Sequence, residues 1–251
     1  MSIPTFSPHV TEGLLPLNLP IEQTGPDLFA FGDVERIAEY TAFVHPLPDG
    51  THRNANLEAA VFDIAKQRGG KHLKRQNENG AVVLDGDVVV KYCWEGPALL
   101  EAFASEVTRV GLEQLASTEA HGLKVPKIIG GVTTGHNGML VIEHVPDHVD
   151  VRDMPMLTRD AFRAAKPTRE ALYARTTVLG SGGVLTESVA LDDGEYNTLC
   201  PVDFEPTADQ PLPDQLVRID FGKFPEELRT IPQWQTIRAA ISLGLADARR
   251  G

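Results

Sequence analysis

The feature that most constrains the fold is an alternation of short β-rich runs with one helical pattern between residues 80 and 144. Residues 80–91, GAVVLDGDVVVK, hold two β-rich runs joined by Asp-Gly-Asp, which is typical of a hairpin turn. A helical pattern then starts at Pro97 and continues to about Ala116. Two further strand-like segments follow, at residues 127–132 and 139–144. This order predicts a small antiparallel sheet with one helix packed on it, and therefore an α+β fold.

The segment before this sheet is rich in proline. Seven prolines occur in the first 53 residues, and prolines block long helices and central strands. We therefore expect residues 1–53 to form a flexible arm with one short helix near residues 33–43. A second helix is expected at residues 56–68, because apolar residues recur there on one face and Gly69-Gly70 follows.

Past Pro146 the sequence becomes more helical. A helix is predicted at residues 168–179, and GSGG at 180–183 indicates its end. Two short strands are expected around residues 197–202 and 215–219, and a last amphipathic helix carries Trp234, Ile237, Ile241 and Leu245. We therefore expect three regions: the arm (1–53), a lobe with the sheet (54–145) and a second lobe (146–251).

Charge and composition exclude some classes of function. The net charge is −12 with no block of Lys or Arg, which disfavours nucleic acids and anionic membranes as partners. Cys93 and Cys200 lack the spacing of a zinc site or a disulfide framework. No apolar stretch approaches the roughly 20 residues of a membrane span, and the N-terminus lacks the basic start and apolar block of a Sec signal peptide. These criteria predict a cytosolic protein, and a chain passed from one cytosol into another would look the same.

Lys91 ends the run VVVK, and the helix that follows offers two glutamates as partners. At about 100° per residue, Glu106 borders the apolar stripe of this helix, whereas Glu101 lies nearly opposite it. We therefore expect Glu106, and not Glu101, to face Lys91. A lysine held by a glutamate can bind the phosphates of a nucleotide. The alternative is a surface ion pair, which contributes little energy.

Three polar residues lie beside the two late strands. Asp192 and Asn197 are five positions apart, just before the first of these strands, and Asp220 follows the second in the stretch IDFG. An aspartate where a strand stops, such as Asp220, can hold a metal ion, although it can also cap a turn, and the stretch around Asp192 and Asn197 has ordinary turn composition. Each signal is weak alone. The order lysine, helix glutamate, D-x-x-x-x-N and DFG is much less expected by chance than any one of them.

In this order the chain resembles the protein-kinase-like fold, over about residues 73–222. The resemblance implies a two-lobed fold with a reduced C-terminal lobe, and ATP and Mg²⁺ as cofactors. Lys91 would then bind the α/β-phosphates and Glu106 would hold Lys91. The resemblance assigns the remaining roles to acidic and amide side chains: Asp192 would orient the attacking hydroxyl, with Asp193 as the near alternative, and Asn197 and Asp220 would bind Mg²⁺.

The resemblance also implies a nucleotide site with some departures from the family pattern. Backbone groups around Glu143 and Val145, where the strand LVIEHVP ends, would meet the adenine ring. Gly80 holds the last position of the G-x-G-x-x-G loop, and the other two glycines are replaced. The histidine and arginine that normally precede the catalytic Asp are replaced by Ala190 and Leu191.

The sequence after the DFG motif is short. Only 29 residues follow Gly222, and they contain no A-P-E motif. This resembles the minimal kinases that pathogenic bacteria inject into host cells, of the OspG and NleH group or the HopBF type. The resemblance implies a Ser/Thr kinase effector, made in the bacterial cytoplasm, secreted without a Sec signal and acting on a host protein. Hsp90 or a ubiquitin-loaded E2 are partners suggested only at the level of these families.

Two other functions fit the same residues. A small-molecule phosphotransferase of the aminoglycoside or choline kinase type shares the order of motifs, and a cationic substrate would suit an acidic chain. Such enzymes need a larger helical C-terminal portion for the substrate pocket. A pseudokinase that serves as an interaction module is favoured by the missing glycines and opposed by the retained Lys91, Asn197 and Asp220. Binding of Mg·ATP without phosphate transfer would distinguish the pseudokinase.

Overall fold

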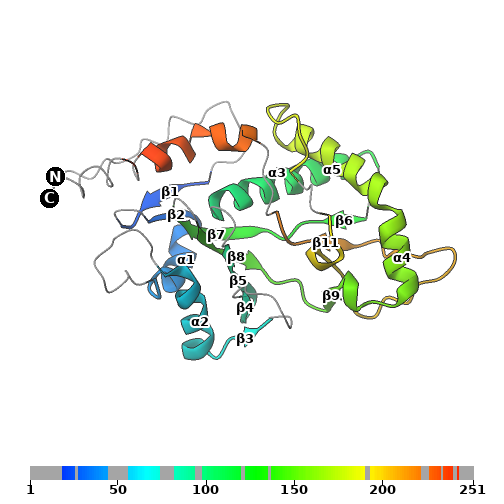
Figure 1. The fold of residues 1–251 in the computed structure, drawn as a ribbon, viewed down its shortest axis with the longest axis horizontal. Coiled ribbons are helices and arrows are strands. Elements are labelled where there is room, and N and C mark those ends of the chain that lie inside the picture. Colours follow the sequence, from blue (N-terminus) through cyan, green and yellow to red (C-terminus); the bar gives the residue numbers. More distant parts are fainter. Residues whose placement is uncertain are drawn as a thin grey trace. The chain divides into compact units, whose positions relative to one another are not determined.

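The chain divides into two compact units. The first comprises residues 1–102, 128–144 and 229–251, and the second comprises residues 103–127 and 145–228. Helix α3 (Ala98–Ala116) begins in the first unit and continues in the second (Figure 1). The structure, a computed structural model, describes residues 19–25, 28–44, 56–73, 82–93, 98–119, 122–134, 137–189, 193–221, 226–232, 234–239 and 242.

The described part of the first unit is built on an antiparallel sheet of seven strands that differ in length, in the order β1-β2-β7-β8-β5-β4-β3. The strands are β1 (Ile21–Gln23), β2 (Phe29–Gly32), β3 (Lys71–His72), β4 (Val82–Asp85), β5 (Val88–Cys93), β7 (Ile128–Thr133) and β8 (Gly138–Glu143). The predicted hairpin is β4–β5, with Asp85 paired to Val88 and Gly86 at a φ of 63° in the turn. Glycine adopts this left-handed conformation without a steric penalty. The predicted α+β class, the hairpin and the two strands that became β7 and β8 are confirmed.

The expectation of an irregular N-terminal arm is wrong for residues 21–23 and 29–32, which form strands β1 and β2, whereas the short helix expected near residues 33–43 is confirmed. All four residues of β2 are buried, and β2 pairs with β7 along its whole length. Helix α1 (Val34–Thr41) follows at once, and the side chain of Asp33 caps it by accepting from the backbone of Arg36. Pro20 stands directly before β1, where a missing N–H costs no ladder hydrogen bond. The density of prolines therefore did not exclude strands between them.

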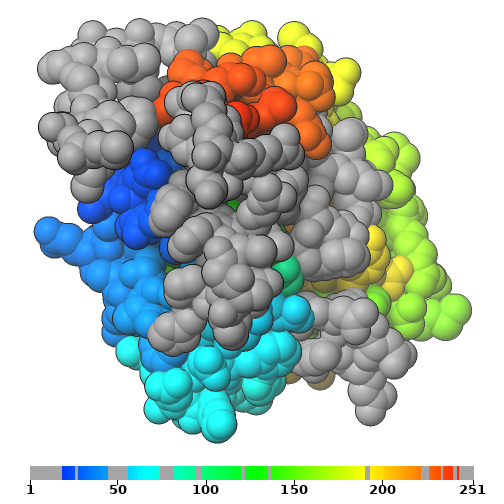
Figure 2. Space-filling view, turned by 60° about the vertical axis from the view of Figure 1, so that its left-hand side comes forward, coloured from blue at the N-terminus to red at the C-terminus, as the bar shows by residue number. Residues whose placement is uncertain are grey.

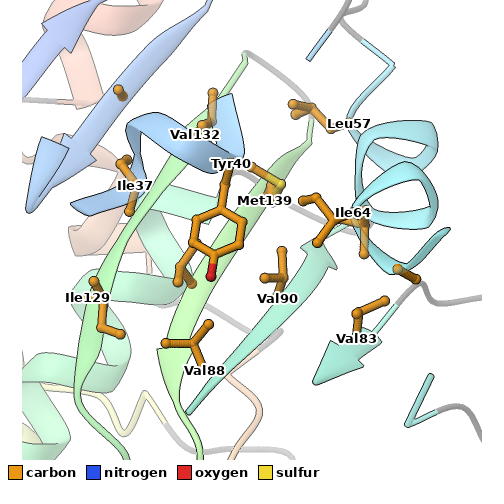
Figure 3. Close-up of a cluster of buried hydrophobic side chains, with 14 residues drawn as sticks. Ile37, Tyr40, Leu57, Ile64, Val83, Val88, Val90, Ile129, Val132 and Met139 are labelled. Carbon is orange, nitrogen blue, oxygen red and sulfur yellow. The ribbon is translucent and has the colours of Figure 1, made fainter. Parts of the chain in front are cut away.

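Helices α1 and α2 (Leu57–Arg68) cover one face of this sheet. Figure 3 shows Ile37 and Tyr40 from α1 and Leu57 and Ile64 from α2 directed at the valines of the central strands. Burying each aliphatic side chain contributes about 1.5–3 kcal/mol. The hydroxyl of Tyr40 donates to Asp85 Oδ2 at 3.0 Å, which ties α1 to the β4–β5 turn.

Helix α2 has the ends that its sequence predicted. The side chain of Asn56 accepts from the backbone of Ala59 at 3.0 Å, and Gly69 ends the helix in the left-handed conformation. Its outer side lies at the surface of the molecule, in cyan in Figure 2. Near the C-terminus, residues 234–239 are helical with Trp234 and Ile237 buried, and Ile241 and Leu245 lie outside the described residues.

The second unit contains a smaller sheet in the order β6-β11-β10-β9. Its strands are β6 (Leu123–Lys124), β9 (His148–Asp150), β10 (Thr198–Pro201) and β11 (Leu216–Arg218). The short 3₁₀ turns are η2 (Val151–Asp153), η3 (Glu195–Asn197) and η4 (Glu226–Thr230). Strands β10 and β11 confirm the two predicted late strands.

Two helices complete the second unit, α4 (Met156–Ala164) and α5 (Lys166–Gly180). Helix α5 ends at GSGG as expected, with Gly182 and Gly183 at positive φ. The part of α3 in this unit packs on α5 through glycines. A Cβ on Gly111 would lie 2.1 Å from the carbonyl oxygen of Thr176, and one on Gly180 would lie 1.8 Å from that of Val107. The two helix backbones therefore approach too closely for any side chain at these positions.

Candidate functional site

Lys91, in the middle of β5, forms an ion pair with a helix glutamate as expected, but with the other one. Its Nζ lies 2.6 Å from Oε1 of Glu101, and the two side chains are 18% and 7% exposed. The thiol of Cys93 donates to the second oxygen of the same carboxylate, at 3.1 Å. Both oxygens of Glu101 are thus engaged, and the carboxylate holds the ammonium group in one place. A fixed ammonium group can bind phosphate oxygens as a point charge.

The expected partner, Glu106, makes a different contact. It accepts two hydrogen bonds to its Oε2 from Arg109, at 3.0 Å from Nε and 2.7 Å from Nη2. These hydrogen bonds raise the pKa of Arg109 above its ordinary value. The expectation that Glu101 faces away from Lys91 is wrong because α3 has no polar face in this region. Every residue from Ala98 to Thr108 is buried, so closeness to an apolar stripe did not distinguish the two glutamates.

Cys93 could have been found from the sequence. It lies two positions after Lys91 in a strand, and alternate residues of a strand point to the same face. A thiol on the same face as a lysine is an ordinary core residue in most strands. The position of Glu101 in the fold is what gives this thiol a carboxylate to donate to.

In the second unit, Asn197 and Asp220 lie beside the same end of the β10–β11 pair. Thr198, the first residue of β10, is paired with Arg218, the last residue of β11. The backbone N–H of Ile219 donates to the carbonyl oxygen of Asn197 at 3.0 Å. Asn197 is 3% exposed and Asp220 is half-buried. Their expected role as Mg²⁺ ligands stays a prediction.

Asp193, the near alternative to Asp192, is committed elsewhere. Its side chain has no exposed surface and is bound by Arg169, whose Nε donates to Oδ2 at 2.8 Å. A group that meets a substrate hydroxyl must be accessible to it, and this burial argues against Asp193 in that role. Asp192 and Gly80 lie outside the described residues.

The strand that was expected to meet the adenine ring is β8. Its last residue, Glu143, is exposed, and the backbone of His144 donates to Asp87 at 3.0 Å. Val145 follows and is half-buried. The chain turns at Asp147, which has a positive φ of 56°. The strand ends where the sequence indicated, and the contact with adenine stays a prediction.

Two other features are absent from the part of the chain that the structure describes. The described residues contain no group of three or more His, Cys, Asp or Glu side chains placed to hold a metal ion. Within the same residues, no helix has both the length and the apolar character needed to cross a membrane.

Comparison with known proteins shows limited similarity. No protein-family model matches the sequence, and no curated protein matches it. A solved structure that is similar in part is that of the Rio2 kinase–ADP/Mg²⁺–phosphoaspartate complex from Chaetomium thermophilum. The identity is 12%, the TM-score is 0.31, and the match covers 83% of this chain and 66% of that chain. This chain therefore spans slightly less than two thirds of that kinase, and its function has to be inferred from its own residues.

Proposed function

We propose that the chain is an ATP- and Mg²⁺-dependent phosphotransferase of the protein-kinase type, acting on a Ser or Thr hydroxyl of another protein. The observation that carries the proposal is the partly buried ion pair between Lys91 on the antiparallel sheet and Glu101 on a helix, 2.6 Å apart. A strand lysine held by a helix glutamate is the arrangement with which protein kinases bind the phosphates of ATP. Asn197 and Asp220 follow later in the chain in the order that the same chemistry uses.

The residues present suit Mg²⁺. The amide oxygen of Asn197 and the carboxylate of Asp220 are hard oxygen donors at one end of a strand pair. Mg²⁺ usually keeps several waters and takes one or two carboxylates together with substrate phosphates. A protein cluster of three or more carboxylates is therefore not required. Bound there, Mg²⁺ would supply neutralisation of phosphate charge.

The protein groups have separate tasks in this proposal. Lys91 binds phosphate oxygens, and Glu101 keeps its ammonium group in place with the help of Cys93. Asp192 orients the substrate hydroxyl, on the strength of the sequence alone. Phosphoryl transfer depends mostly on positioning and charge neutralisation, so a small set of polar groups is sufficient.

The experiment that tests the proposal measures transfer of labelled γ-phosphate from ATP, in Mg²⁺, to a generic protein substrate and to proteins of a eukaryotic lysate. Lys91→Ala and Asp220→Ala are each expected to lower transfer about a hundredfold or more. Lys71→Ala and Asp209→Ala, which change exposed residues of the same types, serve as matched controls and should transfer like the wild type. A discrete labelled band would identify the protein substrate. We propose that the chain is an effector injected into a host cell and that its substrate is a host protein.

Two results would change the assignment. Mg·ATP that stabilises the wild type, without transfer to any substrate, would make the chain a nucleotide-binding pseudokinase. Transfer to a small cationic molecule and not to protein would favour a small-molecule phosphotransferase. No effect of ATP on stability or labelling would contradict the proposal altogether.

A further inference from the structure

A buried cluster of three charged side chains lies in the second unit, next to the segments that carry Asn197 and Asp220. Arg169 comes from α5, Asp193 from the segment before η3, and Arg218 from the end of β11; they are 5%, 5% and 1% exposed. Arg169 donates from Nε to Asp193 Oδ2 at 2.8 Å, and its Nη2 lies 2.7 Å from the same oxygen. Arg218 Nη1 lies 3.7 Å from the other carboxylate oxygen.

Arg169 is fixed by more than its ion pair. Its Nη1 donates to the carbonyl oxygen of Phe162 at 2.5 Å, and its guanidinium carbon lies 3.5 Å from the centre of the Phe162 ring. A cation so close to an aromatic face is attracted by the ring. The position of Arg169, and with it that of Asp193, is therefore set by α4 and α5.

The presence of Arg218 raises the free-energy cost of burying the cluster. Two guanidinium groups share one carboxylate, and among the described residues no guanidinium nitrogen of Arg218 has a hydrogen-bond partner. Removing such charges from water costs several kcal/mol per ion, and apolar residues of similar volume often give equal or greater stability. Burial raises the pKa of the neighbouring Tyr173, and the charge of Asp193 raises it further, which keeps the tyrosine neutral. A cluster of this composition is poorly suited to stabilise a core and well suited to fix a geometry.

The geometry that it fixes is that of the two candidate Mg²⁺ ligands. The segment from Asp193 to Thr198 contains Asn197, and the segment from Arg218 onward contains Asp220. The two segments are joined at one end by the backbone pairing of Thr198 with Arg218 and the N–H of Ile219 donating to Asn197. The ion pair of Asp193 with Arg218 joins them a second time. The two segments are therefore linked through the backbone at Asn197 and Thr198 and through a side chain at Asp193.

We propose that Asp193, Arg169 and Arg218 are positioning residues that hold Asn197 and Asp220 in the relative placement needed to bind Mg²⁺ with ATP. This inference rests on the proposed phosphotransferase function. Loss of the cluster should therefore weaken the use of Mg²⁺ much more than the contact of Lys91 with phosphate, which belongs to the first unit.

The test compares Asp193→Asn and Arg218→Met with the wild type. Mg²⁺ is titrated at fixed ATP, and the rise in thermal stability gives the Mg²⁺ concentration at half-saturation, without any need for turnover. Groups that orient metal ligands typically change metal affinity 10- to 100-fold, so each variant should raise this concentration about tenfold or more. The KM for ATP at saturating Mg²⁺ should stay within about threefold, and kcat should fall. The double variant should be little worse than either single one, because the residues act as a unit.

Three controls separate positioning from simple stability. Glu119→Gln breaks a surface ion pair with Arg175 in the same unit and should leave the Mg²⁺ requirement unchanged. Leu115→Ala removes a buried side chain of α3 and lowers stability without touching the cluster. Arg218→Lys keeps the charge, and its Mg²⁺ requirement should lie closer to that of the wild type than the requirement of Arg218→Met does. If Asp193→Asn does not fold, the comparison of Arg218→Lys with Arg218→Met still tests the inference.

The outcomes are distinct. Unchanged Mg²⁺ half-saturation in folded Asp193→Asn and Arg218→Met, with a loss of stability like that of Leu115→Ala, would overturn the inference and leave the proposed function intact. Equal behaviour of the Met and Lys variants would also overturn it, because the charge would then be irrelevant. A wild type whose stability does not respond to Mg²⁺ and ATP would overturn the proposed function, and the inference with it.

Discussion

At the scale of single residues, the carboxylate of Glu101 is the most informative group in the first unit. It pairs with Lys91 and accepts from Cys93, whereas Glu106 is held by Arg109. We expect Glu101→Gln to lower kcat/KM for ATP about tenfold to a hundredfold, because a hydrogen bond to a charged group contributes about 1.5–3 kcal/mol. Glu106→Gln, the matched change on the same helix, should cost less than about threefold. Steady-state kinetics gives kcat/KM for ATP in both variants. A larger loss in Glu106→Gln than in Glu101→Gln would show that Glu106, the glutamate expected from the sequence, is the one that supports ATP binding.

The thiol of Cys200 gives a prediction on pH. Burial raises its pKa from 9.0 to about 11, so the folded state favours the neutral thiol. This contribution to stability is complete below pH 9 and is lost as the pH rises towards 11, because the unfolded chain then releases the proton first. The cost of Cys200→Ala, measured by urea unfolding, should accordingly shrink by about 2 kcal/mol between pH 8 and pH 11. Tyrosines titrate in both proteins and cancel. A cost that is independent of pH would show that this thiol titrates normally.

At the scale of elements, the contact of α3 with α5 depends on two glycines. Because the added Cβ of Gly111→Ala would lie 2.1 Å from a backbone carbonyl oxygen, one helix has to move. We expect a loss of about 3 kcal/mol in the free energy of unfolding, measured by urea titration. Ala171→Gly, on the exposed side of α5, should cost only about 1 kcal/mol. Equal costs would mean that the two helices separate easily.

The elements that the sequence predicted well are those set by local signals. Helix α2 has a capping Asn56 and a terminal Gly69, and the β4–β5 hairpin has Gly86 in its turn. Strand β2 has no such signal, because its place in the sheet depends on β7, far along the chain. For the candidate site, the sequence alone showed the order of Lys91, Asn197 and Asp220 along the chain.

The choice between Glu101 and Glu106 could not be made from the sequence, since the part of α3 that carries both glutamates is buried on all sides and has no polar face. The cluster around Arg218 also left no pattern, because its members come from three separate segments and meet only in the folded chain.

At the scale of the whole molecule, the structure predicts that the fold includes residues that composition assigned to an arm. Phe31 of β2 has no exposed surface, whereas Phe62 of α2 is 39% exposed. Phe31→Ala should lower the free energy of unfolding by about 3–5 kcal/mol, and Phe62→Ala should cost much less. Urea unfolding of the two variants provides the comparison. A chain that starts at residue 54 should not fold, because it lacks β2 and leaves the edge of β7 unpaired; a soluble, cooperatively unfolding product would contradict this.

The pairing of β2 with β7 also has a consequence for synthesis in the cell. The strand Phe29–Gly32 leaves the ribosome on the order of 100 residues before Ile128–Thr133, its partner in the sheet. At roughly 5–20 residues per second, this apolar strand waits for several seconds with the edge that pairs with β7 still open. During that time it is a target for chaperones and for aggregation with other nascent chains. The yield of soluble protein should therefore depend on the speed of translation between these two strands.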